Sequence, residues 1–175
     1  MPTQNARALL KIYTACAETL YPILKNLPDE QLNWQPAPDS RSIGELARHL
    51  IRVDKWFFDR LGFDHSISDP GETDAGKLLA ALQNTHRQIS DILNAMQDDA
   101  DLIRKSGAAD ARPHDTLAEI VVHIAQHYLY HHAQMVYLRR ARDRDWKAPL
   151  DSWENASYAL SDALAVIQKL FSEES

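Results

Sequence analysis

The stretch that decides the fold is TLAEIVVHIAQHYLYHHAQMVYLRRA, residues 116–141. It opens with Thr116 and Glu119 at the spacing of a capping box, in which each residue satisfies a backbone amide of the first helical turn. It contains neither proline nor glycine, so it is predicted to form one long helix. Four of the eight histidines of the chain fall in this helix.

Four other segments show apolar residues at spacings of three and four, with Pro, Gly and Asp gathered between them. We expect helices over residues 5–26, 73–97 and 151–171. A further helix is expected to begin at a second capping box, formed by Ser42 and Glu45, and to end at the loop after Gly62. Residues 98–114 are expected to form a polar connection. No sustained alternation of apolar and polar residues indicates strands. The sequence therefore predicts an all-α fold, a four-helix bundle with an additional C-terminal helix, in a single domain over residues 1–175.

Composition limits the classes of function. The 175 residues are 45% hydrophobic and 25% charged, which is typical of one globular domain. The net charge of −6 disfavours binding to nucleic acids and anionic membranes, and no signal peptide or membrane span is recognised. Cys16 is the only cysteine, so any metal would be held by His, Asp or Glu. We expect a cytoplasmic protein with no nucleic-acid or membrane partner.

The histidines of the long helix are spaced for metal binding. His123, His127 and His131 are four residues apart and share one helix face, and two adjacent imidazoles at this spacing can bind one metal ion. His49, beside the apolar stripe of the second helix, is the natural candidate for a third ligand. A buried histidine is also often a hydrogen-bonded core residue, and His123 could be a ligand, a residue supporting the ligands or a surface residue.

The remaining candidates have simpler interpretations. His132 is rotated by about 100° from His131 and is expected to face another helix or solvent. Trp34 and Cys16 are interpreted as packing residues, and the basic residues 139–147 as a solvated helix end. The tyrosines of the long helix are interpreted as packing residues with a polar tip: Tyr128, Tyr130 and Tyr137. No role is assigned to His65, His86 and His114.

Two motifs together resemble the DinB/YfiT-like superfamily of small helical metalloenzymes. They are SIGELARHLIRVDKWFF at residues 42–58 and HIAQHYLYHHAQMVYLRR at residues 123–140. The family pairs a motif Ser-Ile-Gly-Glu-Leu-x-x-His with a motif His-x-x-x-His-x-x-x-His-Arg-Gly-Gln. Residues 27–50, LPDEQLNWQPAPDSRSIGELARHL, also resemble the family, so the likeness covers most of the chain.

The resemblance implies that His49, His127 and His131 bind a divalent metal ion. His123 matches a family histidine that is not usually a ligand. Gln134 matches the family glutamine, which could hydrogen-bond to a ligand and orient it.

The sequence departs from the family motifs in two places. Arg41 stands where the family often has an aromatic residue, and His132-Ala133 replaces Arg-Gly. These departures keep the three ligands but leave the substrate preference open.

Three neutral imidazoles leave coordination positions open on a divalent ion, which is typical of a catalytic site. A bound water or thiol would there be shifted toward its ionised, nucleophilic form. The resembled family includes thiol-dependent S-transferases and isomerases and proteins described as hydrolases. We therefore predict a metal-dependent hydrolase or thiol S-transferase, whose nucleophile is metal-bound water or thiolate.

The acidic residues Glu45, Asp54 and Glu119 are not spaced to act as a general base beside the histidines, which weakens the hydrolase prediction more than the thiol prediction. Zn, Ni, Fe and Mn are not distinguished as the ion. We expect a small-molecule substrate, for which a thiol is a candidate, and a homodimer formed through Trp56, Phe58 and the Ala-rich tail helix. The alternative is a non-catalytic bundle, with a role in stress, that binds a metal or a small ligand.

Overall fold

The computed structural model describes residues 1–69, 71, 74–108 and 115–172. Its helices are α1 (Gln4–Glu18), α2 (Tyr21–Leu24), α3 (Asp29–Leu32), α4 (Ile43–Leu61), α5 (Ala75–Ala95), α6 (Asp99–Ile103), α7 (Leu117–Arg142), α8 (Leu150–Ser161) and α9 (Ala163–Ser172). Besides helices, the described residues contain one isolated β-bridge, between Lys105 and Thr116. The all-α prediction is confirmed. None of the described helices has the length and hydropathy to cross a membrane.

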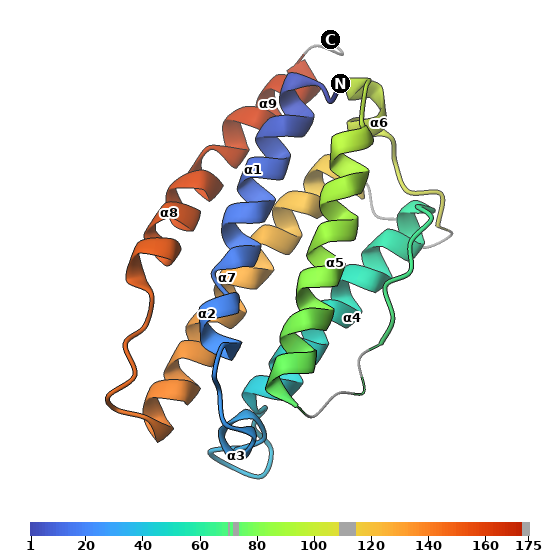
Figure 1. The fold of residues 1–175 in the computed structure, drawn as a ribbon. Helices are drawn as coiled ribbons and strands as arrows, with labels where there is room; N and C mark the ends of the chain where they lie inside the picture. Colours follow the sequence, from blue (N-terminus) through green and yellow to red (C-terminus); the bar gives the residue numbers. More distant parts are fainter. Residues whose placement is uncertain (70, 72–73, 109–114, 173–175) are drawn as a thin grey trace.

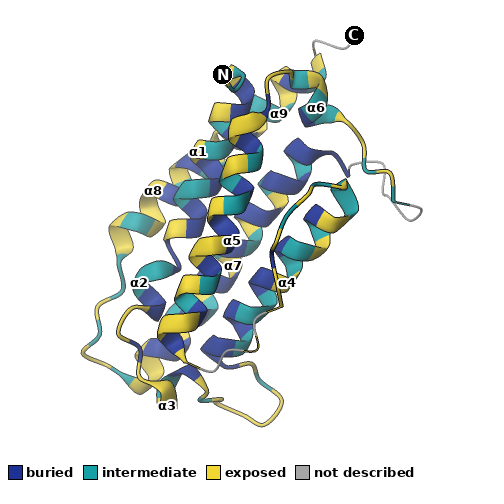
Figure 2. Ribbon diagram, turned by 45° about the vertical axis from the view of Figure 1, so that its right-hand side comes forward, coloured by how far each residue is buried: buried dark blue, intermediate teal, exposed yellow. Residues whose placement is uncertain are grey.

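The four long helices form the body of the molecule. Helix α1 packs on α5 and α7, and α4 packs on the same two helices, so the four lie side by side (Figure 1). Their inward faces are buried and their outward faces are exposed (Figure 2). Helices α8 and α9 pack against α1 and α7. This arrangement is consistent with the predicted four-helix bundle and its additional C-terminal helical segment.

Contacts at the helix ends fix the direction of each long helix. The Thr3 amide donates to the Met96 carbonyl, so α1 and α5 are antiparallel. Arg60 pairs with Asp115, so α4 and α7 are also antiparallel. His132 reaches the Thr19 carbonyl at the end of α1, so α1 and α7 are parallel. Helices α4 and α5 therefore run in the same direction, and the connection between them joins opposite ends of the bundle (Figure 1).

Helix α4 begins and ends as its sequence predicts. The Ser42 amide donates to Glu45 Oε2 over 2.8 Å and the Glu45 amide donates to Ser42 Oγ over 3.2 Å, so both halves of the capping box are formed. Gly62 ends the helix in the left-handed region at φ 71°, which glycine adopts without steric cost. These caps fix the register of the helix that carries His49.

Two helix boundaries differ from the prediction. The helix expected over residues 5–26 breaks after Glu18, because Pro22 lacks the amide that a continuous helix would need, and α2 starts anew at Tyr21. The single tail helix expected over 151–171 is two helices, α8 and α9. At their junction the Ser161 hydroxyl donates to the Tyr158 carbonyl, a local bond that competes with continued helix.

Part of the predicted polar connection is also helical. Residues 99–103 form α6, which starts where the Asp98 side chain accepts from the Ala100 amide. Helical structure therefore extends into a stretch that the hydrophobic pattern left unassigned.

Several packing predictions are now settled. Cys16 is fully buried and Trp34 packs on the core, as expected. His132 is buried and faces α1, with Nδ1 3.2 Å from the Thr19 carbonyl oxygen. The expectation of a solvated helix end fails at Arg139, which is buried.

The Arg139 guanidinium satisfies carbonyls left free at the end of α2. It donates to the carbonyls of Pro22 and Lys25 over 3.0 and 3.2 Å, and also to that of Ile23. A charged side chain can be buried here because the helix end supplies acceptors for its N–H groups.

The proposed dimer surface needs one correction. Phe58 was expected on that surface but is fully buried, with its ring centroid 5.9 Å from that of Phe63. Trp56 is about half exposed, and the Arg60 guanidinium lies 4.5 Å from its ring centroid. Phe58 therefore contributes to the core of this chain.

Candidate metal centre

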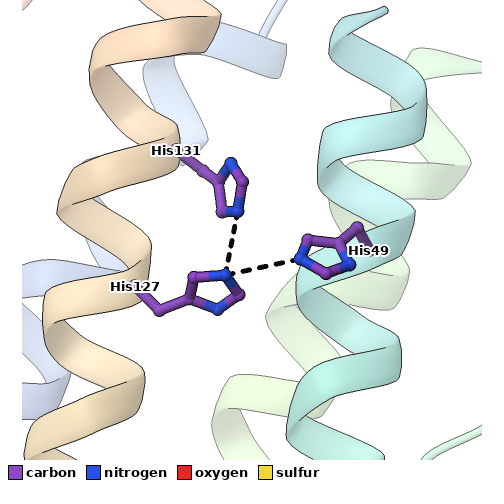
Figure 3. Close-up of side chains that lie close together, drawn as sticks. All are labelled: His49, His127 and His131. Atoms are coloured by element: carbon purple, nitrogen blue, oxygen red, sulfur yellow. Dashed lines mark hydrogen bonds between the residues drawn. The ribbon is translucent and has the colours of Figure 1, made fainter. Parts of the chain in front are cut away.

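Three histidines from two helices converge on one point. His49 projects from α4, and His127 and His131 project from successive turns of α7 (Figure 3). The Nε2 atom of His127 lies 3.3 Å from Nε2 of His49 and 2.9 Å from Nε2 of His131. One ligand nitrogen from each residue lies within 4.8 Å of the other two. We call this group the histidine triad.

The environment keeps these imidazoles neutral. Burial lowers the pKa of all three, and for His127 the nearby histidines add to this effect and bring the pKa to about 4. The positive charge of Arg41 acts in the same direction on the pKa of each histidine. At neutral pH the triad therefore offers lone pairs, which is the form that binds a metal ion.

A hydrogen bond orients one of the rings. His131 Nδ1 lies 2.7 Å from Gln134 Oε1, which can only accept, so Nδ1 carries the proton and Nε2 keeps its lone pair toward the triad. His131 is also the most buried of the three, with 4% of its surface exposed. Gln134 therefore contacts a triad histidine, and its support of a bound ion stays a prediction.

The donor atoms fit a divalent ion. Nitrogens bound to zinc at about 2.0–2.1 Å are about 3.3 Å apart at a tetrahedral angle and about 2.9 Å apart at a right angle. The separations of His127 Nε2 from His49 Nε2 and from His131 Nε2 match these two values. Without a cation, lone pairs of neutral imidazoles that converge at such distances repel one another unless protons lie between them. Among the described residues, these three histidines could hold a metal ion.

A cleft of about 770 Å³ opens beside the triad. Its wall includes His131, Gln134 and the side chains of Arg41, Leu46, Tyr130 and Tyr137. The packing role expected for Tyr130 and Tyr137 is wrong, because they are 62% and 71% exposed and line this cleft, whereas Tyr128 is buried as expected. A molecule in the cleft would lie in contact with a triad histidine.

Neighbouring histidines stay outside this group. His123 is exposed, and its ring lies against Phe57 and His127, with centroids 5.4 and 6.1 Å apart. Within the described part of the chain no hydrogen bond joins it to the triad, so it has the position of a flanking residue. His65 is on the loop after α4, and its Nε2 lies 3.2 Å from Oδ1 of Asp59, which is in α4. His114 falls outside the described residues.

Acidic residues are engaged elsewhere. Glu45 accepts from the Ser42 amide and from Gln35, Glu119 interacts with Thr116 at the start of α7, and Asp54 is buried and accepts from the Tyr128 hydroxyl. No aspartate or glutamate occurs among the described residues that line the cleft. Whether another group acts as a general base beside the histidines stays open.

Sequence reasoning missed the importance of Arg41, Tyr130 and Tyr137. Arg41 was noted only as a departure from a family motif. The tyrosines are seven residues apart in α7, the spacing of one helix face, but the face they share could be assigned to a cleft only after α4 was placed.

Comparisons with known proteins agree with this description. The family model described as the DinB superfamily matches residues 12–135, a range that includes the triad and Gln134. The solved structure of a DinB-like protein from Bacillus cereus aligns with a TM-score of 0.66 and 21% identity, over 81% of this chain and 93% of that one. No curated protein matches the sequence. The structural likeness supports the fold, and the family match covers most of the chain. The chain belongs to the DinB superfamily.

Proposed function

We propose that this protein is a metal-dependent thiol S-transferase in which the histidine triad holds a divalent ion at the wall of the cleft. The observation that carries the proposal is the convergence of three neutral imidazoles beside an open cleft with no carboxylate in its described lining. Such an ion, when bound, supplies a Lewis acid that favours the ionised form of a thiol or a water molecule. Hydrolysis by the same site is the less favoured form of the proposal.

The composition of the cleft favours thiol transfer. Hydrolysis usually requires a group that removes a proton from water and returns it to the leaving group, and Asp or Glu often serves. A thiol ionises far more readily than water, so it can lose its proton to solvent without a carboxylate nearby. In the proposed reaction the thiol sulfur forms a C–S bond with an electrophilic carbon, and the leaving group departs with the bonding electron pair.

The protein side chains have distinct parts in this proposal. The histidine triad would bind the ion, and Gln134 would hold His131 in the required tautomer and orientation through its 2.7 Å hydrogen bond. The rings of Tyr130 and Tyr137 would contact the body of the substrate at the cleft wall. None of these tasks requires a side chain to transfer a proton.

The first test is metal content. We would purify the protein without a His tag, load it with Zn, Ni, Fe or Mn, and measure bound metal by elemental mass spectrometry. Near-stoichiometric metal is expected in the wild type and in His123→Ala, which removes an exposed histidine from the same helix. His49→Ala, His127→Ala and His131→Ala should each lose most of it. Retention of metal in all three variants would overturn the triad as the binding site.

The second test is activity. The metal-loaded protein would be given cysteine or 2-mercaptoethanol with 1-chloro-2,4-dinitrobenzene as electrophile, and 4-nitrophenyl acetate in a separate assay of hydrolysis. Thiol transfer that exceeds the uncatalysed rate and is lost in His127→Ala would support the proposal. Stoichiometric metal binding with no transfer to these or other electrophiles would favour the non-catalytic alternative.

Dimerisation and cytoplasmic location stay predictions. With Phe58 in the core, a homodimer would use Trp56 or the outer face of α8, where Trp153 and Tyr158 are 44% and 66% exposed. Sedimentation equilibrium of the wild type and of a Trp153→Ser variant would test this. Fractionation of the native host would test the location.

A further inference from the structure

Arg41 carries a charge that no other described residue neutralises. It directly precedes Ser42, the N-cap of α4, is exposed, and lines the cleft together with His131. No hydrogen bond, ion pair or ring contact joins Arg41 to another described residue. By contrast, the Arg60 side chain is 10% exposed and donates to Asp115 over 3.0 Å.

The position of Arg41 matters because its charge reaches the metal centre. It lines the same cleft as His131, and its positive charge lowers the pKa of each histidine in the triad. A guanidinium stays charged at any physiological pH and presents its N–H donors in a planar fork that matches a carboxylate. An anionic group held by Arg41 would therefore lie near the triad.

The rest of the cleft is suited to an apolar body. Pro36, Leu46, Ala133 and Leu138 contribute apolar surface, and the rings of Tyr130 and Tyr137 flank it. Its volume of about 770 Å³ lies within the range of about 300–1,000 Å³ typical of small-molecule sites. Arg41 is the only permanently charged residue among the described residues that line it.

We infer that the cleft binds a small molecule that carries a carboxylate on an apolar body, and that Arg41 recognises this carboxylate. The inference rests on the proposed function, because it places this molecule beside the histidine triad as a reactant. It makes Arg41 a specificity-determining residue, because the described residues of the wall beside it include no acidic group to compete with the ligand. Exchange of a carboxylate for a neutral amide on the same body should therefore weaken binding.

The test uses a matched pair of probes, 3-phenylpropanoate and 3-phenylpropanamide, which share an apolar body and differ in the charged group. Affinities would be measured by NMR titration of the full chain, both metal-free and zinc-loaded. The variants are Arg41→Gln, Arg41→Lys and Arg104→Gln. Arg104 is exposed and follows α6, at the opposite end of the bundle from the start of α4, so its substitution gives the same charge change away from the cleft (Figure 1).

We expect the wild type and Arg104→Gln to bind the carboxylate at least fivefold more tightly than the amide in both metal states. In Arg41→Gln the two affinities should become equal to within about twofold, and Arg41→Lys should keep part of the preference. A carboxylate preference that survives in Arg41→Gln would overturn the inference, and so would a preference found only with zinc, since the carboxylate would then be binding the ion. A failure to bind either probe would overturn it as well.

The two proposals fail separately. If Arg41 controls carboxylate binding in the metal-free protein but no thiol transfer is found, the proposed reaction is wrong and the recognition by Arg41 stands. If transfer occurs and Arg41→Gln shows the same carboxylate preference as the wild type, the reaction stands and the assignment of Arg41 is wrong.

Discussion

At the scale of single residues, the hydrogen bond from His131 Nδ1 to Gln134 is the contact most open to measurement. It fixes the tautomer that leaves Nε2 free, and loss of such a contact typically weakens metal binding about 10–100-fold. We expect that loss for zinc in Gln134→Leu, which keeps similar bulk and removes the acceptor. Competition with a chromophoric chelator at neutral pH would measure the dissociation constants.

The matched control for this prediction is Gln126→Leu, the same exchange at an exposed position of α7. It should leave the dissociation constant for zinc unchanged to within about twofold. An equally small change in Gln134→Leu would show that packing alone orients His131.

Most of the triad could be predicted from the sequence, and most of the cleft could not. The spacing of His127 and His131 fixes their common helix face, and the family motif adds His49. The role inferred for Arg41 could not be predicted in the same way, because it depends on Arg41 being unpaired among the described residues and lining the cleft. That information arises only when α4 and the loop before it are placed against α7.

At the scale of helices, a second buried polar contact, besides the histidine triad, ties α7 to α4. The Tyr128 hydroxyl donates to Asp54, and both residues are fully buried. Burial raises the pKa of the Asp54 carboxyl, and its other oxygen, Oδ1, has no hydrogen-bond partner among the described residues. The Tyr13 hydroxyl lies 3.5 Å from that of Tyr128 and extends the group toward α1.

Tyr128→Phe should therefore destabilise the fold without affecting the metal centre. Removal of the hydroxyl leaves a buried carboxyl group with no donor, which costs about 1–3 kcal/mol. The free energy of unfolding would be measured in urea at pH 7. Zinc binding should persist, because the Tyr128 hydroxyl bonds to Asp54 and lies near the Tyr13 hydroxyl, and its ring packs on His86, away from the ligand nitrogens of the triad.

Tyr137→Phe makes the same chemical change at an exposed position of the same helix and should alter the unfolding free energy by less than about 0.5 kcal/mol. Equal stability of the two variants would mean that the Tyr128 hydroxyl contributes nothing to the joint between α4 and α7.

The helices themselves were predicted best where caps mark their ends. The capping box at Ser42 and Glu45 placed the start of α4, whereas the break after Glu18 lies within a continuous apolar stripe. Hydrophobic periodicity reports which face is buried, and this face continues from α1 into α2. The break depends on the backbone at Pro22. It also depends on hydrogen bonds from His132 to the Thr19 carbonyl and from Arg139 to the Pro22 carbonyl, and these two residues come from a distant part of the sequence.

At the scale of the whole molecule, buried histidines should make stability depend on pH. His86 is 4% exposed, its Nδ1 lies 2.8 Å from the Tyr21 hydroxyl, and burial lowers its pKa to about 3. Between pH 6.5 and 3 the unfolded chain therefore binds a proton at this residue that the folded chain does not. The stability from the neutral ring is complete above pH 6.5 and falls by about 1.4 kcal/mol per pH unit below it.

In His86→Phe the free energy of unfolding should fall less steeply below pH 6.5, by about 1.4 kcal/mol per pH unit less than in the wild type. Urea unfolding at pH 7.5, 5.5 and 4.5 would compare the two proteins, with the value at pH 7.5 as the reference for each, since loss of the bond to Tyr21 can change the baseline. The triad and His132, whose pKa values are also lowered by burial, contribute with the same sign in both proteins, and Asp54 contributes with the opposite sign. Parallel profiles would contradict the prediction.

The histidine triad also joins two distant parts of the sequence, because His49 and His127 are 78 residues apart. An ion bound there can bind fully only when α4 and α7 are packed together, so it should stabilise the folded state by about 2.7 kcal/mol at a hundredfold excess over its dissociation constant. For a chain of this length, 1 kcal/mol corresponds to about 2–4 °C in Tm. We therefore expect zinc at pH 7.5 to raise the Tm of the wild type and of His123→Ala by about 5–10 °C, measured by circular dichroism. His49→Ala keeps both histidines of α7 but loses the ligand from α4, so its Tm should rise by less than about 2 °C. An equal rise in His49→Ala would mean that α7 alone binds the ion and that the metal does not hold the two helices together.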